Sequence, residues 1–173
     1  AELVQAGGGG PVADVGCGPG RITTYLDKLG LDVRGVDLSP EMVAVARRLY
    51  PGISFAVGTM TDLDLADGAL AGLVAWYSII HTPPSQLPAV FAEFARVVRP
   101  GGHLMFAFQV GDFERRRIEQ AYGHAVAADA YRLPPDGTAD LLAAAGIEVT
   151  ARLVRQPEGQ WESTPQAYLM ARR

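Results

Sequence analysis

Along the first two thirds of the chain, short apolar runs alternate with segments in which apolar residues recur every three or four positions. The short runs predict buried strands, and the three-to-four-residue spacing predicts amphipathic helices. We expect strands at 11–16, 33–36, 53–57, 73–77 and 103–110, and helices at 22–29, 40–50 and 83–98. Such alternation favours right-handed crossovers and a parallel sheet covered on both faces.

The last third departs from this rhythm. Residues 111–133 are polar, and we expect a partly helical connection there, with the basic run 115–117 on a solvated helix face. A helix at 134–146 then precedes strand candidates at 147–154 and 166–171. Because no helix fits between these two strands, they should pair antiparallel. The predicted fold class is therefore α/β, a parallel sheet that closes with a hairpin.

The segment DVGCGPG, from Asp14 to Gly20, joins the first strand to the first helix. The alternate glycines Gly16, Gly18 and Gly20 let the backbone turn tightly and approach a ligand without an intervening Cβ atom. The helix that follows offers unpaired N–H groups and a positive dipole end, which suit a carboxylate or a phosphate. The alternative is a tight turn that binds nothing.

An acidic residue ends the second strand. Asp37 comes 21 residues after Gly16, and an acid in this position can accept both hydroxyls of a ribose at the carboxyl edge of the sheet. Its alternative role is a favourable charge before the helix that Ser39 caps. Dinucleotide-binding turns read G-x-G-x-x-G, whereas Arg21 follows the last glycine here. Asp14 would repel a pyrophosphate but could pair with an ammonium group, so we infer an adenosine with a zwitterionic tail, S-adenosylmethionine.

Three segments resemble motifs of the class I S-adenosylmethionine-dependent methyltransferases, and the resemblance covers nearly the whole chain. They are DVGCGPG at 14–20, the ribose segment VDLSPEMVAVAR at 36–47 and RVVRPGGHL at 96–104. The resemblance implies a doubly wound, Rossmann-like, mostly parallel seven-stranded sheet in the order 3-2-1-4-5-7-6, with the last strand antiparallel and helices on both faces. It also implies one domain at 1–173, with lid helices upstream of residue 1.

The same resemblance implies how the cofactor is bound. In that family an acid after the third strand usually binds the adenine amino group. Thr59 stands in that place here, so packing by Met60 and the Thr59 hydroxyl would hold the adenine. The segment AWYSIIH at 75–81 resembles the one that lines the methionine part and faces the acceptor. The implied cofactor-binding residues are Asp14, Gly16, Cys17, Gly18, Gly20, Asp37, Leu38, Met42, Thr59, Met60, Tyr77 and Ser78.

Two residues after the fourth strand are candidate catalytic groups. His81 could act as a general base on the acceptor, because a histidine titrates near neutral pH, and Tyr77 is the second candidate. The alternatives are a loop histidine that bonds backbone groups and a tyrosine that packs against the cofactor. His124 is a weaker candidate for acceptor contact, and Trp161 could add aromatic surface.

Composition bears on the partners, the location and the metal content to be expected. The 19 acidic and 15 basic residues give a net charge of −4, which argues against nucleic acid and anionic membranes as partners. The single Cys17 cannot form an internal disulfide, so we expect a cytoplasmic protein. One cysteine and three scattered histidines predict no metal site.

We therefore expect in-line methyl transfer from S-adenosylmethionine to a small-molecule acceptor. The alternatives are a non-catalytic S-adenosylmethionine-binding protein and, with less support, an NAD(P)-dependent oxidoreductase.

Overall fold

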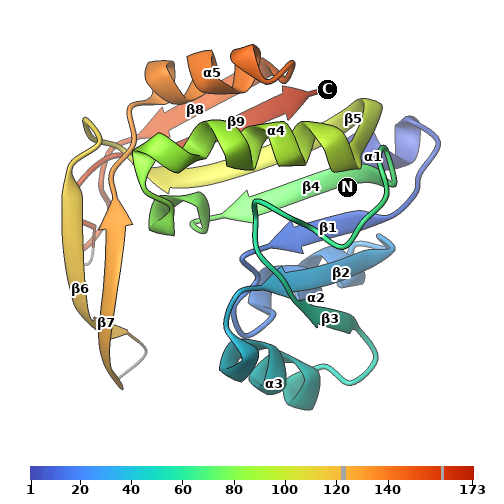
Figure 1. Cartoon of the computed structure of the whole chain (residues 1–173), viewed down its shortest axis with the longest axis horizontal. Coiled ribbons are helices and arrows are strands. Elements are labelled where there is room, and N and C mark those ends of the chain that lie inside the picture. Colours follow the sequence, from blue (N-terminus) through green and yellow to red (C-terminus); the bar gives the residue numbers. More distant parts are fainter. Residues whose placement is uncertain (122–123, 161) are drawn as a thin grey trace.

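A computed structural model of the chain describes residues 1–121, 124–160 and 162–173. Its central sheet has seven strands in the order β3-β2-β1-β4-β5-β9-β8 (Figure 1). Their bounds are β1 Val12–Val15, β2 Val33–Asp37, β3 Ser54–Val57, β4 Leu70–Trp76, β5 Val98–Gln109, β8 Glu148–Arg155 and β9 Gln166–Arg172. The first five are parallel, and β9 runs antiparallel to both of its neighbours. The predicted order 3-2-1-4-5-7-6 is confirmed, since β8 and β9 are the sixth and seventh strands of this sheet.

Helices cover both faces of the sheet. On one face lie α1 Glu2–Ala6, α2 Arg21–Lys28 and α3 Pro40–Leu49, and on the other α4 Leu87–Val97 and α5 Pro135–Ala144. Figure 1 shows α4 across the front of the sheet and α2 behind it. The front layer packs Phe91 and Phe94 of α4 against Phe106 of β5, all fully buried. Each such side chain contributes about 1.5–3 kcal/mol by leaving water.

Local signals set the start of α3 and the end of α2. The Ser39 hydroxyl accepts a hydrogen bond from the Met42 N–H at 3.2 Å, and Pro40 occupies the first helical turn. Gly30 follows α2 with a φ of 79°, in the left-handed region that favours glycine. Both boundaries agree with the sequence predictions.

The prediction of a partly helical connection at 111–133 is wrong. That segment contains a second sheet, the hairpin of β6 Arg115–Ala121 and β7 His124–Tyr131. The basic run 115–117 therefore lies on a strand and not on a helix face. Ala130 is buried against the main core and Ile118 is partly buried there, so tertiary packing overrides the local polar pattern.

Three further elements differ from prediction. The segment predicted as one helix at 83–98 forms a short 3₁₀ helix, η2 (Pro84–Gln86), followed by α4. β4 begins at Leu70 and β5 at Val98, because these two residues pair across the strands before the regular ladder starts. A further 3₁₀ helix, η1 (Ile79–His81), follows β4.

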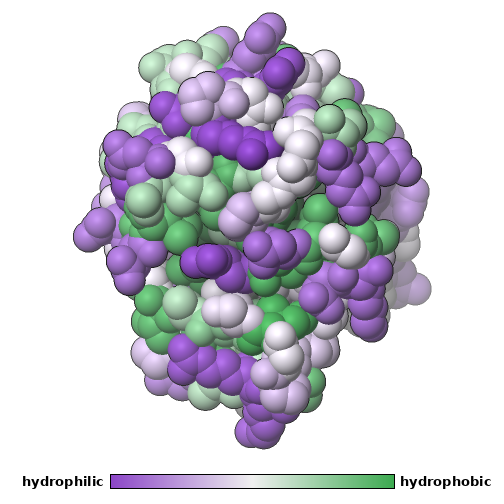
Figure 2. Space-filling view, turned by 90° about the vertical axis from the view of Figure 1, so that its right-hand side faces the viewer, coloured by the Kyte–Doolittle hydropathy of each residue, from purple (hydrophilic) through white to green (hydrophobic). Residues whose placement is uncertain are grey.

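The amino ends of the parallel strands lie on the right in Figure 1. Seen from that side, the surface has hydrophobic groups between bands of hydrophilic ones (Figure 2). Within residues 1–121, 124–160 and 162–173, no helix combines the length and hydropathy that crossing a bilayer requires.

Candidate functional site

The predicted site residues converge at the carboxyl edge of the sheet. The glycine-rich turn follows β1, Asp37 ends β2, Thr59 and Met60 come after β3, and Tyr77 and Ser78 come after β4. Because these four strands are neighbours and parallel, their carboxyl ends lie side by side. Open α/β sheets place ligands at such an edge.

Gly16 is where this turn touches the segment after β4. Its φ is 76°, and a Cβ atom built on it would lie 2.2 Å from the Ser78 Cβ and 2.8 Å from the Met60 Cε. The buried Ser78 hydroxyl donates to the Val15 carbonyl at 2.7 Å. Only glycine fits at position 16, and the close packing brings three of the predicted site residues together.

Gly18 and Gly20 have different surroundings. Gly18 has a φ of 53°, and no atom of the described residues lies within 4 Å of its Cβ position. Gly20 caps α2 with a φ of 86°, and its Cβ position is 2.8 Å from the Phe55 ring of β3. Gly18 is therefore open to an approaching ligand, whereas Gly20 allows α2 to pack on the sheet.

Asp37 holds the turn from the neighbouring strand. Its Oδ2 accepts from the Gly18 N–H at 2.7 Å, and its Oδ1 accepts from the Ser39 N–H at 2.9 Å. The helix-start role that the sequence offered as an alternative is thus present. An ionised carboxylate has about four acceptor positions, so capacity for two hydroxyl groups remains. The ribose contact stays a prediction.

Asp14 lies beneath the turn and is almost inaccessible, with 1% of its surface exposed. The Thr23 hydroxyl of α2 donates to its Oδ2 at 2.7 Å. Burial, which disfavours the charged form, raises the pKa of Asp14 to about 6. A cation beside the turn would favour the ionised form of Asp14. The carboxylate could therefore form an ion pair with the ammonium group of a ligand.

Cys17 does not supply a nucleophile in this environment. The thiol is buried, and burial together with the nearby Asp14 carboxylate raises its pKa to about 12. The thiol therefore remains protonated at neutral pH, whereas the thiolate is the reactive form. Its predicted role within the cofactor turn is untouched by this.

The residues predicted to bind adenine and ribose lie on the outer part of the edge. Leu38 is 73% exposed. The Met60 sulfur lies 4.0 Å from the Thr82 hydroxyl, and the Thr59 and Thr61 hydroxyls are 3.0 Å apart. Met42 is half-buried on α3. Their contacts with a cofactor stay predictions.

Tyr77 turns away from the glycine-rich segment toward β9. Its φ of 53° is left-handed, a strained conformation for a tyrosine. Its hydroxyl donates to Gln166 Oε1 at 2.8 Å and lies 3.2 Å from the Tyr168 hydroxyl. Burial first, and then Tyr168, raise the pKa of Tyr77 above its ordinary value. Tyr77 is therefore a neutral phenol at physiological pH and not a ready base.

His81 is exposed, and its Nδ1 lies 2.9 Å from the Asp129 carbonyl of β7. Because a carbonyl only accepts, Nδ1 carries the proton, and the lone pair of the neutral ring is on Nε2. This contact agrees with the alternative of a loop histidine that bonds backbone. The catalytic role stays a prediction. The side chain of His124 and the whole of Trp161 lie outside the described residues.

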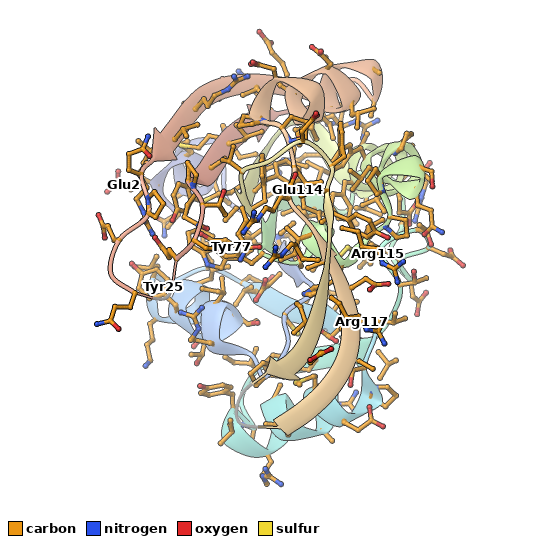
Figure 3. The ribbon with its side chains drawn as sticks, turned by 90° about the vertical axis from the view of Figure 1, so that its left-hand side faces the viewer. Glu2, Tyr25, Tyr77, Glu114, Arg115 and Arg117 are labelled. Carbon is orange, nitrogen blue, oxygen red and sulfur yellow. The ribbon has the colours of Figure 1, made fainter. Side chains whose placement is uncertain are left out.

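A pocket of about 620 Å³ lies between the β6–β7 hairpin and the carboxyl edge. Tyr77, Gln166 and Tyr168 line it on the sheet side, and Arg116 and Arg132 are among its hairpin residues. Figure 3 looks onto this edge, with the hairpin in front, Tyr77 to its left and Arg115 to its right.

Sequence reasoning missed most of these pocket residues. The alternation of β9 is the signal that could have placed Gln166 and Tyr168 on one face. In the part of the chain that the structure describes, no three histidine, cysteine or acidic side chains gather as metal ligands.

Comparison with known proteins agrees with this geometry. A family model described as "Methyltransferase domain" matches residues 12–102. A malonyl-(acyl-carrier protein) O-methyltransferase of Pectobacterium atrosepticum is 32% identical over 120 residues, which are 69% of this chain and 46% of that protein. The chain thus spans about half the length of the curated relatives it matches.

Solved structures share the fold. One described as a SAM-dependent methyltransferase from Methanosarcina mazei has a TM-score of 0.84 at 18% identity, over 95% of this chain and 92% of that one. A Burkholderia thailandensis 1,6-didemethyltoxoflavin-N1-methyltransferase, bound to 1,6-didemethyltoxoflavin and S-adenosylhomocysteine, has a TM-score of 0.75 at 22% identity, over 99% and 75% of the two chains. At these identities the likeness concerns the fold.

Proposed function

The chain belongs to the methyltransferase family whose domain model spans residues 12–102, and on this basis we propose that the protein transfers a methyl group from S-adenosylmethionine to a small-molecule acceptor. The observation that carries the proposal is the convergence of Asp14, the open Gly18 and Asp37 on two neighbouring parallel strands. By its name, one relative is an O-methyltransferase of malonyl-(acyl-carrier protein), in which the malonyl group is small, and one structure of the same fold is named for the small molecule 1,6-didemethyltoxoflavin; both names support a small acceptor group.

Each part of the cofactor has a candidate partner in this arrangement. The adenosine would lie against the open side of Gly18, with its ribose hydroxyls on the two remaining acceptor positions of Asp37. The exposed Leu38, with Met42, Thr59 and Met60, would surround the adenine. The ammonium group of the tail would approach the buried Asp14, directly or through water. Gly16, Cys17, Gly20 and Ser78 would give the turn its shape.

The chemistry asks little of the protein beyond alignment. S-adenosylmethionine supplies a methyl group that is already activated as a sulfonium. The residues of this chain therefore have to orient the acceptor in line and exclude water, and alignment of this kind can lower a barrier by several kcal/mol. Tyr77 would orient the acceptor as a neutral phenol. His81, through Nε2, is the candidate base where the acceptor must lose a proton.

Other properties rest on sequence alone and are part of the same proposal. A single domain over 1–173, a cytoplasmic location and a lack of nucleic-acid or membrane partners follow from the length, the lone Cys17 and the net charge of −4. The alternative is a protein that binds the cofactor but has no transferase activity. A measurement of activity distinguishes it from a methyltransferase.

The test is transfer of an isotopically labelled methyl group. The full-length protein is incubated with methyl-labelled S-adenosylmethionine and a metabolite extract, and low-molecular-mass products are separated by mass spectrometry. We expect labelled product together with S-adenosylhomocysteine, and less of both with the Asp37→Ala variant at a cofactor concentration that does not saturate it. Tight cofactor binding without any labelled product would favour the non-catalytic alternative.

A further inference from the structure

The pocket under the hairpin and the cofactor turn meet at the segment after β4, where Tyr77 and Ser78 are consecutive residues. Tyr77 lines the pocket, and the next residue, Ser78, packs directly on Gly16 of the cofactor turn. An acceptor seated in the pocket would therefore lie beside the cofactor tail. The chemistry of the pocket wall then indicates what kind of acceptor fits.

Arginine dominates the charged part of the wall. The guanidinium groups of Arg116, Arg117, Arg132 and Arg155 line the pocket together with two carboxylates, Glu119 and Glu162. Arg155 and Glu162 form a two-pronged pair, with both N–O distances at 2.6 Å, and so neutralise each other. The other charged lining residues are Arg116, Arg117, Arg132 and Glu119, and of these Arg117 pairs with Asp129 at 3.3 Å.

Arg132 and Arg116 each have N–H donors that the described residues do not use. The Arg132 side chain is 19% exposed; it donates to the Ser163 hydroxyl at 2.8 Å and approaches Glu114 at 3.4 Å. A guanidinium has five N–H donors, so several remain. Arg116 makes no hydrogen bond or ion pair through its side chain with the described residues, and it pairs with Ala130 on the inward face of the hairpin.

The opposite face of the hairpin is already neutralised. Arg115 and Arg117 alternate with Arg116 along β6, and both reach Asp129, at 2.8 and 3.3 Å. Arg115 does not line the pocket. The hairpin arginine without an ion-pair partner among the described residues, Arg116, is therefore on the inward face, toward Tyr77.

The tyrosine hydroxyls cannot provide the donors that an anion needs. The Tyr77 proton is used by Gln166 Oε1, and this amide is oriented by its own donation to the Thr164 carbonyl at 2.8 Å. Tyr168 is then the donor to the Tyr77 oxygen. The two rings and Ile118 instead supply apolar surface, so the arginines are left as the groups that would bind an anion.

We propose that this pocket takes an acceptor with a carboxylate on a small apolar or aromatic body, and that Arg116 and Arg132 bind the carboxylate. A carboxylate suits the pocket better than a phosphate, because the unneutralised Glu119 repels a dianion more strongly than a monoanion. Naming the acceptor class in this way rests on the proposed methyltransferase function.

The experiment uses three probes of similar shape: benzoate, its neutral analogue benzamide, and phenyl phosphate. Each is titrated into the ¹⁵N-labelled protein, and amide shifts of the hairpin and of Tyr77 are followed by NMR. We expect benzoate to bind at least about tenfold more tightly than benzamide, and no less tightly than phenyl phosphate. Arg116→Gln should weaken benzoate binding at least about fivefold.

Arg115→Gln is the matched control, since it removes the same charge from the adjacent residue on the outer face. It should change benzoate binding by less than about twofold. Equal binding of benzoate and benzamide, tighter binding of phenyl phosphate, or equal losses in the two variants would each overturn the proposal. S-adenosylmethionine titrated into the same samples reports separately on the proposed function, and Arg116→Gln should leave its affinity unchanged.

Discussion

The Tyr77 hydroxyl donates a 2.8 Å hydrogen bond to the buried Gln166 side chain, across 89 residues of sequence. The bond joins the segment after β4 to the start of β9, two strands away in the sheet. It fixes the Tyr77 ring over the pocket and gives the amide of Gln166 a defined orientation. A residue with a strained backbone is thus held by a contact that no local pattern specifies.

Removal of this donor should destabilise the fold. Tyr77→Phe leaves the buried Gln166 oxygen without its partner, and an unsatisfied buried acceptor costs about 1–3 kcal/mol. The free energy of unfolding, measured in urea, should fall by that amount. Tyr168→Phe is the control, because Gln166 keeps its donor, and the loss should stay below about 1 kcal/mol. Equal losses in the two variants would contradict the assigned directions of these bonds.

Asp14 should make the stability depend on pH in a recognisable direction. Its pKa is about 6 in the folded protein against an ordinary value of 3.8, so the folded state holds the proton more tightly. The resulting stabilisation is fully present below pH 3.8 and is lost as the pH rises through 6. The shift corresponds to about 3 kcal/mol.

The variant Asp14→Asn removes this titration and keeps the side-chain volume. Between about pH 4 and 7.5, the unfolding free energy of the wild type should fall by about 2.5 kcal/mol relative to the variant. The comparison is needed because other carboxylates, such as Glu162 with its lowered pKa, act in the opposite direction. Asp27→Asn, at an exposed site on α2, controls for the loss of a charge. A constant difference between wild type and Asp14→Asn across this range would refute the raised pKa.

Substitutions of two glycines in the turn should affect stability and cofactor binding differently. Gly16→Ala places a methyl group 2.2 Å from the Ser78 Cβ, and we expect a loss of more than about 3 kcal/mol in unfolding free energy, or no folding. Gly18→Ala meets no described atom and should cost about 1 kcal/mol through its positive φ. The Gly18 variant should nevertheless bind S-adenosylmethionine at least about tenfold more weakly. Unchanged affinity there would exclude the open side of Gly18 as the ligand surface.

Two variants of His81 distinguish a general base from a residue that only bonds the Asp129 carbonyl. Asparagine can donate from nearly the position of the imidazole Nδ1, so His81→Asn keeps the bond to the Asp129 carbonyl but removes Nε2. We expect both His81→Asn and His81→Ala to lower turnover about 100–10,000-fold and to remove the acidic limb of the pH profile, because both variants lose the general base. Turnover of His81→Asn within about tenfold of the wild type, with a larger loss in His81→Ala, would instead show that His81 serves only through its bond to the Asp129 carbonyl.

The sequence predicted those site residues that belong to a local structural motif. The turn from Asp14 to Gly20, the acid Asp37 and the helix cap Ser39 are each specified by neighbours a few residues away, whereas the strand order was implied by the resemblance to the class I methyltransferases. The β6–β7 hairpin was missed because 115–117 has no alternating apolar pattern. Contacts between distant parts of the chain stabilise it: Ile118 and Ala130 pack on the main core, and Arg115 and Arg117 pair with Asp129 across the strands.

Pocket residues were missed for a related reason. Gln166 and Arg132 meet Tyr77 only after the sheet is assembled, and the sequence carries no local sign of that meeting. Their polarity is typical of exposed loops and strand ends, which made them indistinguishable from solvated positions until the antiparallel pairing of β9 was known.

The central claim is that the turn after β1 binds S-adenosylmethionine, and calorimetric titration of the full-length protein tests it most directly. We predict saturable binding of S-adenosylmethionine, no heat of binding with NAD, and at least about tenfold weaker binding by Asp37→Ala, which loses two ribose contacts. Binding of NAD in place of S-adenosylmethionine, or wild-type affinity in Asp37→Ala, would contradict the account.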